Sequence, residues 1–190
     1  MNESVPVLAI DGPSGSGKGT LAAWMATELG WHLLDSGALY RIVAAMAVRQ
    51  GLDVDAEQTM QALAESLDIA FPDGKVLVDG LDLTDEIRTE DIGVMASRVA
   101  ALPAVRGAIL QLQRNFAKAP GLVADGRDMG TVVFPHAGLK IFLDASAQAR
   151  AERRYNQLKN KGLSVSLRDL LEQIQDCLLY TSPSPRDDEL

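Results

Sequence analysis

A run of glycines and hydroxyl-bearing residues that leads to a lysine carries the clearest chemistry in this sequence. The spacing G-x-x-x-x-G-K is present at Gly12, Gly17 and Lys18. Glycines allow successive backbone N–H groups to converge on one anion, and the lysine adds a mobile positive charge for β- and γ-phosphate oxygens. The sequence therefore predicts a phosphate-binding loop. Its predicted members are Gly12, Pro13, Ser14, Gly15, Ser16, Gly17, Lys18, Gly19 and Thr20.

One position of this loop departs from the general motif. A serine or threonine normally follows the lysine and offers its hydroxyl to Mg²⁺. Here Gly19 follows Lys18, and Thr20 comes one residue late. We therefore expect the phosphates and water to hold most of any Mg²⁺, and we assign no residue as a metal ligand.

Four short apolar segments flank or follow the loop and predict buried parallel strands. Between them, apolar residues recur at helical spacing, while residues 68–83 alternate and predict two or three small antiparallel strands. The predicted fold class is α/β, with a parallel core sheet, helices on both faces and a small antiparallel β insertion. The expected strands are Val5–Ile10, Trp31–Leu34, Leu122–Asp125 and Leu139–Asp144; the expected helices cover about 21–29, 38–50, 55–67 (capped by Asp55), 92–101, 103–116, 146–160 (capped by Ser146) and 166–176 (capped by Ser166).

Length and composition restrict the possible classes of protein. The 190 residues are about one domain's worth, and 47% hydrophobic content is enough for a core. A net charge of −8 argues against a protein that binds nucleic acid duplexes. The single cysteine, Cys177, excludes a disulfide framework. We expect a soluble, cytoplasmic protein with no signal peptide and no membrane partner, and we interpret His32 and His136 as structural residues.

Polar residues follow the predicted strands at the edge where α/β sheets bind ligands. Asp35 and Ser36 follow one strand, Asp125, Arg127 and Asp128 end or follow another, and Arg41 lies one turn into a helix. Arginines near a phosphate loop indicate a second phosphate-bearing substrate held for transfer. The guanine-reading pattern N-K-x-D is absent, because Asn160-Lys-Gly is followed by Leu163. The absence of this pattern disfavours a regulatory GTPase. It leaves the small P-loop kinases in general, with a non-catalytic nucleotide-binding module as the alternative to them.

Three longer motifs resemble the bacterial cytidylate kinases, and the resemblance covers about Val5 to Gln175. These motifs are Asp11-Gly-Pro-Ser-Gly-Ser-Gly-Lys-Gly-Thr20, Leu34-Asp-Ser-Gly-Ala-Leu-Tyr-Arg41 and Ala124-Asp-Gly-Arg-Asp-Met-Gly-Thr-Val-Val-Phe-Pro135. The resemblance implies one kinase domain over 1–176, with a monophosphate-binding insertion at about 36–102 and a helical lid at about 150–176. It also implies a monomer that uses ATP and Mg²⁺ to phosphorylate CMP or dCMP.

The same resemblance implies roles for individual residues. Ser36, Arg41 and Arg127 would hold the acceptor's 5′-phosphate, and Ser97, Arg106 and Asp128 would recognise cytosine. Lys18, Arg127, Arg150 and Arg154 would act on the transferring phosphoryl group. Taken by themselves, Arg106 and the stripe Arg150, Arg153 and Arg154 are also typical of solvated helix faces, and Ser97 of a surface helix. The role of Asp125 stays open.

The end of the chain departs from the resemblance. Where the family's pattern predicts an arginine- and aspartate-rich lid segment, this chain has Cys177, Tyr180, Thr181 and Ser184. We therefore expect residues 177–190 to be an unrelated tail that replaces the family's final segment. On that expectation, kinase activity would be reduced, because a single arginine in a phosphoryl-transfer site can be worth ~10³-fold or more.

Overall fold

The computed structural model describes residues 5–160 and 166–181. The chain divides into two compact units. The first unit contains Met1–Asp11 and Lys18–Phe142, and the second contains Gly12–Gly17 and Leu143–Leu190.

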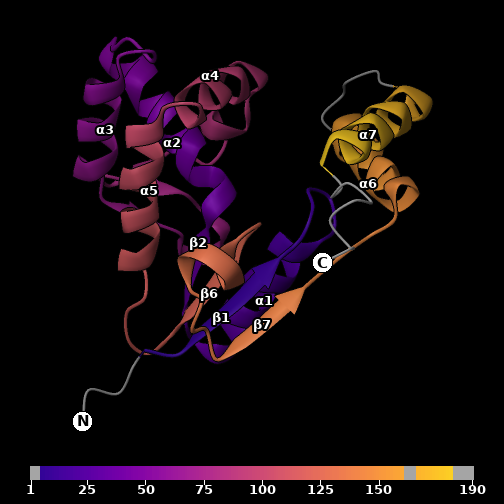
Figure 1. Ribbon diagram of the computed structural model, residues 1–190, viewed down its shortest axis with the longest axis horizontal. Coiled ribbons are helices and arrows are strands. Elements are labelled where there is room, and N and C mark those ends of the chain that lie inside the picture. Colours follow the sequence, from indigo (N-terminus) through magenta and orange to yellow (C-terminus); the bar gives the residue numbers. More distant parts are fainter. Residues whose placement is uncertain (1–4, 161–165, 182–190) are drawn as a thin grey trace, which may run out of the picture. The chain divides into compact units, whose positions relative to one another are not determined.

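A parallel four-stranded sheet forms the centre of the first unit (Figure 1). Its strands β1 (Val7–Asp11), β2 (His32–Asp35), β6 (Leu122–Gly126) and β7 (Leu139–Phe142) lie in the order β2-β6-β1-β7. The register pairs Asp35 with Asp125 and Asp11 with Gly126, so three strands reach the same edge of the sheet together. The predicted fold class and all four predicted core strands are confirmed.

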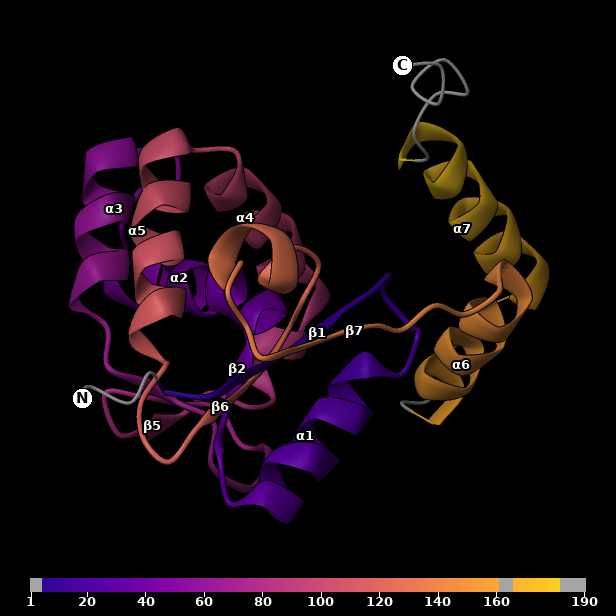
Figure 2. The ribbon, with the colours of Figure 1, turned by 60° about the horizontal axis from the view of Figure 1, so that its bottom comes forward.

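The two faces of the sheet bury different sets of side chains, as the two-residue period of a strand requires. On one face Leu8, Ile10 and Val123 pack with Ala22 and Ala26 of α1 (Lys18–Leu29). On the other face Ala9, Leu34 and Ala124 join the larger core around α2 (Ser36–Gln50). Figure 2 shows α1 and α2 on opposite sides of the sheet. Successive apolar side chains of each strand point to opposite faces of the sheet, so one sheet contributes to two hydrophobic cores.

The range 36–102, where the monophosphate-binding insertion is expected, begins with α2. It contains α3 (Glu57–Ser66), a small antiparallel sheet of β3 (Ile69–Ala70), β4 (Leu77–Val78) and β5 (Leu81–Asp82), and α4 (Glu90–Ala100). The short turns η1 (Pro72–Gly74) and η2 (Glu86–Arg88) connect these elements, and α5 (Pro103–Asn115) follows. The predicted small antiparallel strands are confirmed.

The predicted cap at Asp55 is wrong. Helix α3 begins at Glu57 after Ala56, which makes no side-chain capping bond. The Asp55 carboxylate instead forms an ion pair with Arg98 of α4. The Asp55 carboxylate, which local spacing predicts to cap α3, is therefore bound by an arginine that is distant in the sequence.

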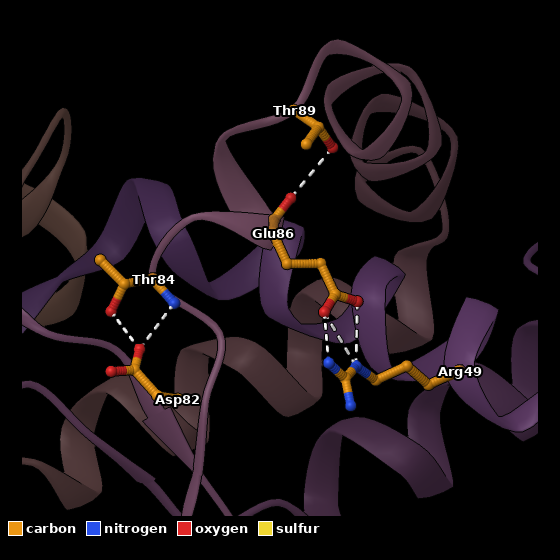
Figure 3. A network of polar contacts seen from close by, with 5 residues as sticks. All are labelled: Arg49, Asp82, Thr84, Glu86 and Thr89. Carbon is orange, nitrogen blue, oxygen red and sulfur yellow. Dashed lines mark hydrogen bonds and ion pairs between the residues drawn. The ribbon is translucent and has the colours of Figure 1, made fainter.

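Two arginines of α2 fasten η2 to the rest of the first unit. Arg49 forms a bidentate pair with Glu86, with Nη2 to Oε2 at 2.5 Å, as Figure 3 shows. About two turns earlier in α2, Arg41 Nη1 donates to the carbonyl oxygens of Ile87 at 2.9 Å and Thr89 at 3.2 Å. Asp82 and Thr84, also drawn in Figure 3, close the turn before η2 through the Thr84 N–H and hydroxyl.

A buried carboxylate joins the end of β1 to η3 (Met129–Val133), a single wide turn that sequence periodicity did not predict. Asp11 is only 8% exposed. Its Oδ1 accepts from the Met129 N–H and its Oδ2 from the Gly130 N–H, both at 2.8 Å. The polypeptide that follows Arg127 and Asp128 is therefore fixed to the neighbouring strand.

The second unit contains the loop Gly12–Gly17, helix α6 (Ala147–Asn160) and helix α7 (Leu167–Thr181). The hydroxyls of Ser146 and Ser166 accept from the N–H groups of Ala149 and Asp169, as predicted for two caps. Helix α7 continues to Thr181, beyond the predicted end near residue 176. The remainder of the predicted tail, residues 182–190, lies outside the described residues.

No single helix in the described ranges is long and apolar enough to cross a membrane. Helices α4 and α5 reach that length and apolarity only when counted together, and they are bent by 102° at their junction.

We predict that Asp11→Asn lowers the free energy of unfolding by roughly 2–3 kcal/mol, because an amide places an N–H₂ group against one of two buried N–H donors. Urea denaturation followed by circular dichroism measures this. The control Asp85→Asn changes an exposed carboxylate that makes no capping bond, and should stay within about 0.5 kcal/mol of the parent chain. Equal stability of the two variants would contradict the role given to Asp11.

Candidate active site

The glycines of the predicted phosphate loop occupy conformations that other residues rarely adopt. Gly12, Gly15 and Gly17 have φ angles of 152°, 78° and 94°. A Cβ on Gly12 would lie 2.1 Å from the Leu143 carbonyl oxygen, so no side chain fits there. The loop is therefore set by backbone geometry, as expected for a segment that presents N–H groups to an anion.

Two arginines of α6 hold the carbonyl oxygens of this loop. Arg150 Nε donates to Ser14 O at 2.7 Å, and Arg153 Nη1 donates to Gly15 O at 3.0 Å. Because N–H and C=O point in opposite directions across a trans peptide, the Gly15 N–H faces away from Arg150. Arg150 is only 7% exposed, so the solvated-stripe interpretation is wrong for this residue. Arg154 is exposed.

Ser16 supplies a polar atom suited to a ligand. The residue is 4% exposed, and its Oγ has no hydrogen-bond partner among the described residues. Its own N–H donates to Pro13 O at 3.3 Å, which closes the turn. A buried hydroxyl without a partner is costly, and a phosphate oxygen arriving in the loop would satisfy it.

In the first unit, Lys18 opens α1 and faces a buried carboxylate at the end of β6. Lys18 Nζ lies 3.8 Å from Asp125 Oδ1, close enough for attraction but too far for a hydrogen bond. Accordingly, Oδ1 has no hydrogen-bond partner among the described residues, although Asp125 is only 6% exposed. Burial raises the pKa of Asp125 to about 7; Lys18 lowers it, while the nearby Asp35 and Asp11 raise it further.

The same carboxylate explains the unusual residue after the lysine. A Cβ on Gly19 would lie 3.1 Å from Asp125 Oδ2, tighter than an ordinary contact. The space that the motif's serine or threonine would fill is therefore already crowded by Asp125.

Ser36 lies against the end of β6, directly before Arg127. A Cβ on Gly126 would come within 2.6 Å of Ser36 Oγ. Asp35 caps α2 by accepting from the Ala38 N–H at 3.2 Å, which places the positive end of this helix at the same edge. Arg127 and Asp128 are exposed. Three of the predicted acceptor-binding residues are thus brought to one end of neighbouring strands.

The other three predicted acceptor-binding residues lie on the insertion helices and α5. The Arg41 guanidinium donates to backbone around η2, and its Nη2 crowds Gly93, where a Cβ would lie 2.9 Å away. Ser97 is exposed and donates to the Gly93 carbonyl oxygen at 3.1 Å. Arg41 and Ser97 therefore share one neighbour, although no described bond links them to Ser36.

Tyr40 connects Arg106 with Asp128 electrostatically. Burial raises the pKa of the Tyr40 hydroxyl, Arg106 lowers it and Asp128 raises it again. Both charges must therefore lie within reach of one phenol. Sequence spacing does not predict Tyr40, Arg153 or Asp11 as site residues, although Asp11 and Tyr40 lie inside the motifs 11–20 and 34–41 and Arg153 lies on the arginine stripe.

The loop and the acceptor edge both fall within one family match. The family model described as cytidylate kinase matches residues 8–177. This chain belongs to the cytidylate kinase family. The predicted family is therefore confirmed, and with it the enzyme class, a nucleoside monophosphate phosphotransferase.

Curated relatives agree with this family. The chain is 59% identical over 182 residues to a protein named cytidylate kinase from Pseudomonas aeruginosa, covering 93% of this chain and 80% of that one. It is 56% identical over 180 residues to the cytidylate kinase of Photobacterium profundum, covering 93% and 79%. The solved structure of TT1252 from Thermus thermophilus is 20% identical, with a TM-score of 0.46 over 98% of this chain and 84% of that one, too weak a likeness to carry an argument.

We predict that Asp125 makes stability fall as pH rises. The folded protein holds the carboxyl proton up to about pH 7, whereas an unperturbed aspartate releases it near 3.8. The contribution of Asp125 to the free energy of unfolding is therefore greatest below about pH 4, and it is lost as the pH rises to about 7. In Asp125→Asn this loss should be absent, so its stability relative to the parent chain should rise between pH 4 and 8 by on the order of 4 kcal/mol.

Urea denaturation at four or five pH values measures that difference. Asp85→Asn, on an exposed carboxylate, serves as the matched control and should give a constant difference. Parallel stability curves for Asp125→Asn and the parent chain would show that Asp125 titrates normally.

Proposed function

We propose that this protein transfers the γ-phosphoryl group of ATP to CMP or dCMP, giving the nucleoside diphosphate. The observation that carries the proposal is that the phosphate loop and the acceptor edge around Ser36, Arg127 and Asp128 both fall within residues 8–177, which match the family. We also propose that it works as a monomer in the cytoplasm.

The donor half of the proposal rests on the loop. The backbone N–H groups of Gly12–Thr20 and the first turn of α1 would bind ATP phosphates. The Ser16 hydroxyl, which has no hydrogen-bond partner in the described ranges, would bind them as well. Lys18 would add its charge at the β- and γ-phosphate oxygens. Arg150 orders the loop through Ser14, and Arg154, exposed on α6, would meet the transferring group. Residues 150–176 would form the lid.

Mg²⁺ fits the end of β6. Carboxylate oxygens are hard ligands of the kind Mg²⁺ prefers, and Asp125 Oδ1 is a buried oxygen without a hydrogen-bond partner among the described residues. Asp125 would hold the ion together with phosphate oxygens and water. When bound, Mg²⁺ would neutralise charge on the β- and γ-phosphates.

The acceptor half rests on the sheet edge and the insertion at 36–102. Ser36, Arg41 and Arg127 would hold the 5′-phosphate, since a guanidinium meets two phosphate oxygens at once. Among the described contacts Arg41 uses only Nη1 for backbone carbonyls, so other N–H groups of its fork remain for phosphate. Phosphoryl transfer then needs mainly positioning and charge stabilisation.

Base selection would fall to Ser97, Arg106 and Asp128. A carboxylate accepts a hydrogen bond from the amino group of cytosine, whereas uracil presents a carbonyl oxygen at that position. Arg106 lowers and Asp128 raises the pKa of the Tyr40 hydroxyl, so both charges act on the same phenol. A site built around such a bond rejects a base that leaves it unmade.

A coupled assay with ATP and a panel of CMP, dCMP, UMP and AMP tests the proposal. CMP and dCMP should give the highest kcat/KM, because only they offer the cytosine amino group to Asp128. A preference for AMP would defeat the cytosine assignment, and ATP binding in calorimetry without turnover of any acceptor would defeat the kinase assignment.

Asp128→Asn should lower kcat/KM for CMP by roughly 10²-fold, because the amide loses the charge that strengthens the bond to the amino group. Turnover of UMP should fall much less. The control Asp85→Asn should keep the parent preference, and a uniform loss for CMP and UMP would assign Asp128 to phosphate positioning instead.

A further inference from the structure

A cavity of about 1150 Å³ opens in the first unit, away from the residues assigned to the kinase reaction. Its walls come from α1, the start of β2, the end of α3, β3 with η1, and the end of α5. Four aromatic side chains line it: Trp24, Trp31, Phe71 and Phe116. None of the predicted site residues is among its lining residues.

The cavity and the acceptor edge lie at opposite ends of β2. His32 and Leu33, at the start of the strand, line the cavity. Asp35, at the end of the strand, pairs with Asp125 at the edge that carries Ser36. An occupant of the cavity therefore contacts residues that the proposed reaction does not use.

Part of the aromatic lining is fixed in place. The Trp31 ring lies against Gly121, where a Cβ would come within 2.3 Å of the indole. Phe71 and Phe116 stack at a tilt of 35° with ring centroids 5.6 Å apart. Trp24, in contrast, leaves 59% of its surface exposed. Because Trp24 lines the same cavity as the three other aromatic side chains, its exposed indole belongs to an aromatic surface rather than standing alone.

The charged residues around the cavity favour a positively charged ligand. Among the described residues that line it, Glu65, Asp68 and Asp73 carry carboxylates and Lys118 carries an ammonium group. All four residues are exposed. The whole chain carries a net charge of −8, which adds to the attraction for cations. Indole faces also attract cations.

We propose that this cavity binds an organic ammonium ion with an apolar or aromatic body. The apolar body would cover Trp24 and lie against Phe71 and Phe116, and the ammonium group would face the carboxylates of Asp68 and Asp73. Pockets that hold small organic ligands typically measure about 300–1,000 Å³, and this cavity is slightly larger, at about 1150 Å³. The site is independent of the proposed kinase function, because it shares no residue with it.

The two tryptophans give the experiment its readout. The chain contains only two, and both line the cavity, so the two indole N–H signals in a nitrogen-15 correlation spectrum report on this site. We use 4-phenylbutylammonium as the probe and 5-phenylpentanoate as its counterpart of opposite charge. The cation should shift both indole signals saturably, and the anion should bind at least about three-fold more weakly.

Charge-removing variants test the assignment of the ammonium position. The double variant Asp68→Asn and Asp73→Asn should weaken binding of the cation by about three-fold or more. Asparagine tolerates the positive φ of 49° at position 73, and the Asp68 side chain is exposed, so the fold should be kept. Asp85→Asn, which removes one charge elsewhere, should bind the cation as the parent chain does.

Three results would overturn the proposal. The first is the absence of saturable indole shifts with 4-phenylbutylammonium, and the second is equal affinity for the cation and the anion. The third is unchanged affinity in the double variant. Loss of kinase activity in any variant has no bearing on these outcomes, because the spectrum measures binding alone.

Discussion

The parallel register of β1, β6 and β2 is the constraint on which the candidate site depends. It aligns Asp35 with Asp125 and places Asp11 beside Gly126, so three carboxylates reach one edge of the sheet. Like charges gathered in a partly buried place repel one another and lose hydration. The groups around this edge offset the repulsion and the lost hydration of each carboxylate.

The three carboxylates differ in the hydrogen bonds and charges that stabilise them. Asp11 receives two backbone N–H groups from η3, and Asp35 receives one from the start of α2. Within the described part of the chain, Asp125 is attracted by Lys18 at 3.8 Å and accepts no hydrogen bond at Oδ1, and burial dominates its pKa. The least compensated oxygen thus lies beside the lysine of the phosphate-binding motif, where charge must be handled during phosphoryl transfer.

Much of the fold was predictable because it follows from local patterns. Short continuous apolar runs predicted the four core strands, and helical spacing predicted the helices within a few residues. The Asp55 cap failed because Arg98 competes for the same carboxylate from another helix. The contact of Arg150 with Ser14, the influence of Arg106 and Asp128 on Tyr40, and the aromatic cavity all join distant segments. The spacing of residues along the chain does not predict contacts between segments that are distant in the sequence.

The close approach of Asp125 to Gly19 has a consequence for how sequences of this kind can diverge. A hydroxyl-bearing residue at position 19 and an aspartate at position 125 compete for one volume, since a Cβ at 19 would lie 3.1 Å from Oδ2. A side chain added at position 19 alone would have to displace that carboxylate, so the effects of changes at the two positions are expected not to add. The two positions should therefore behave as one epistatic unit, exchanging a carboxylate on the strand for a hydroxyl on the helix.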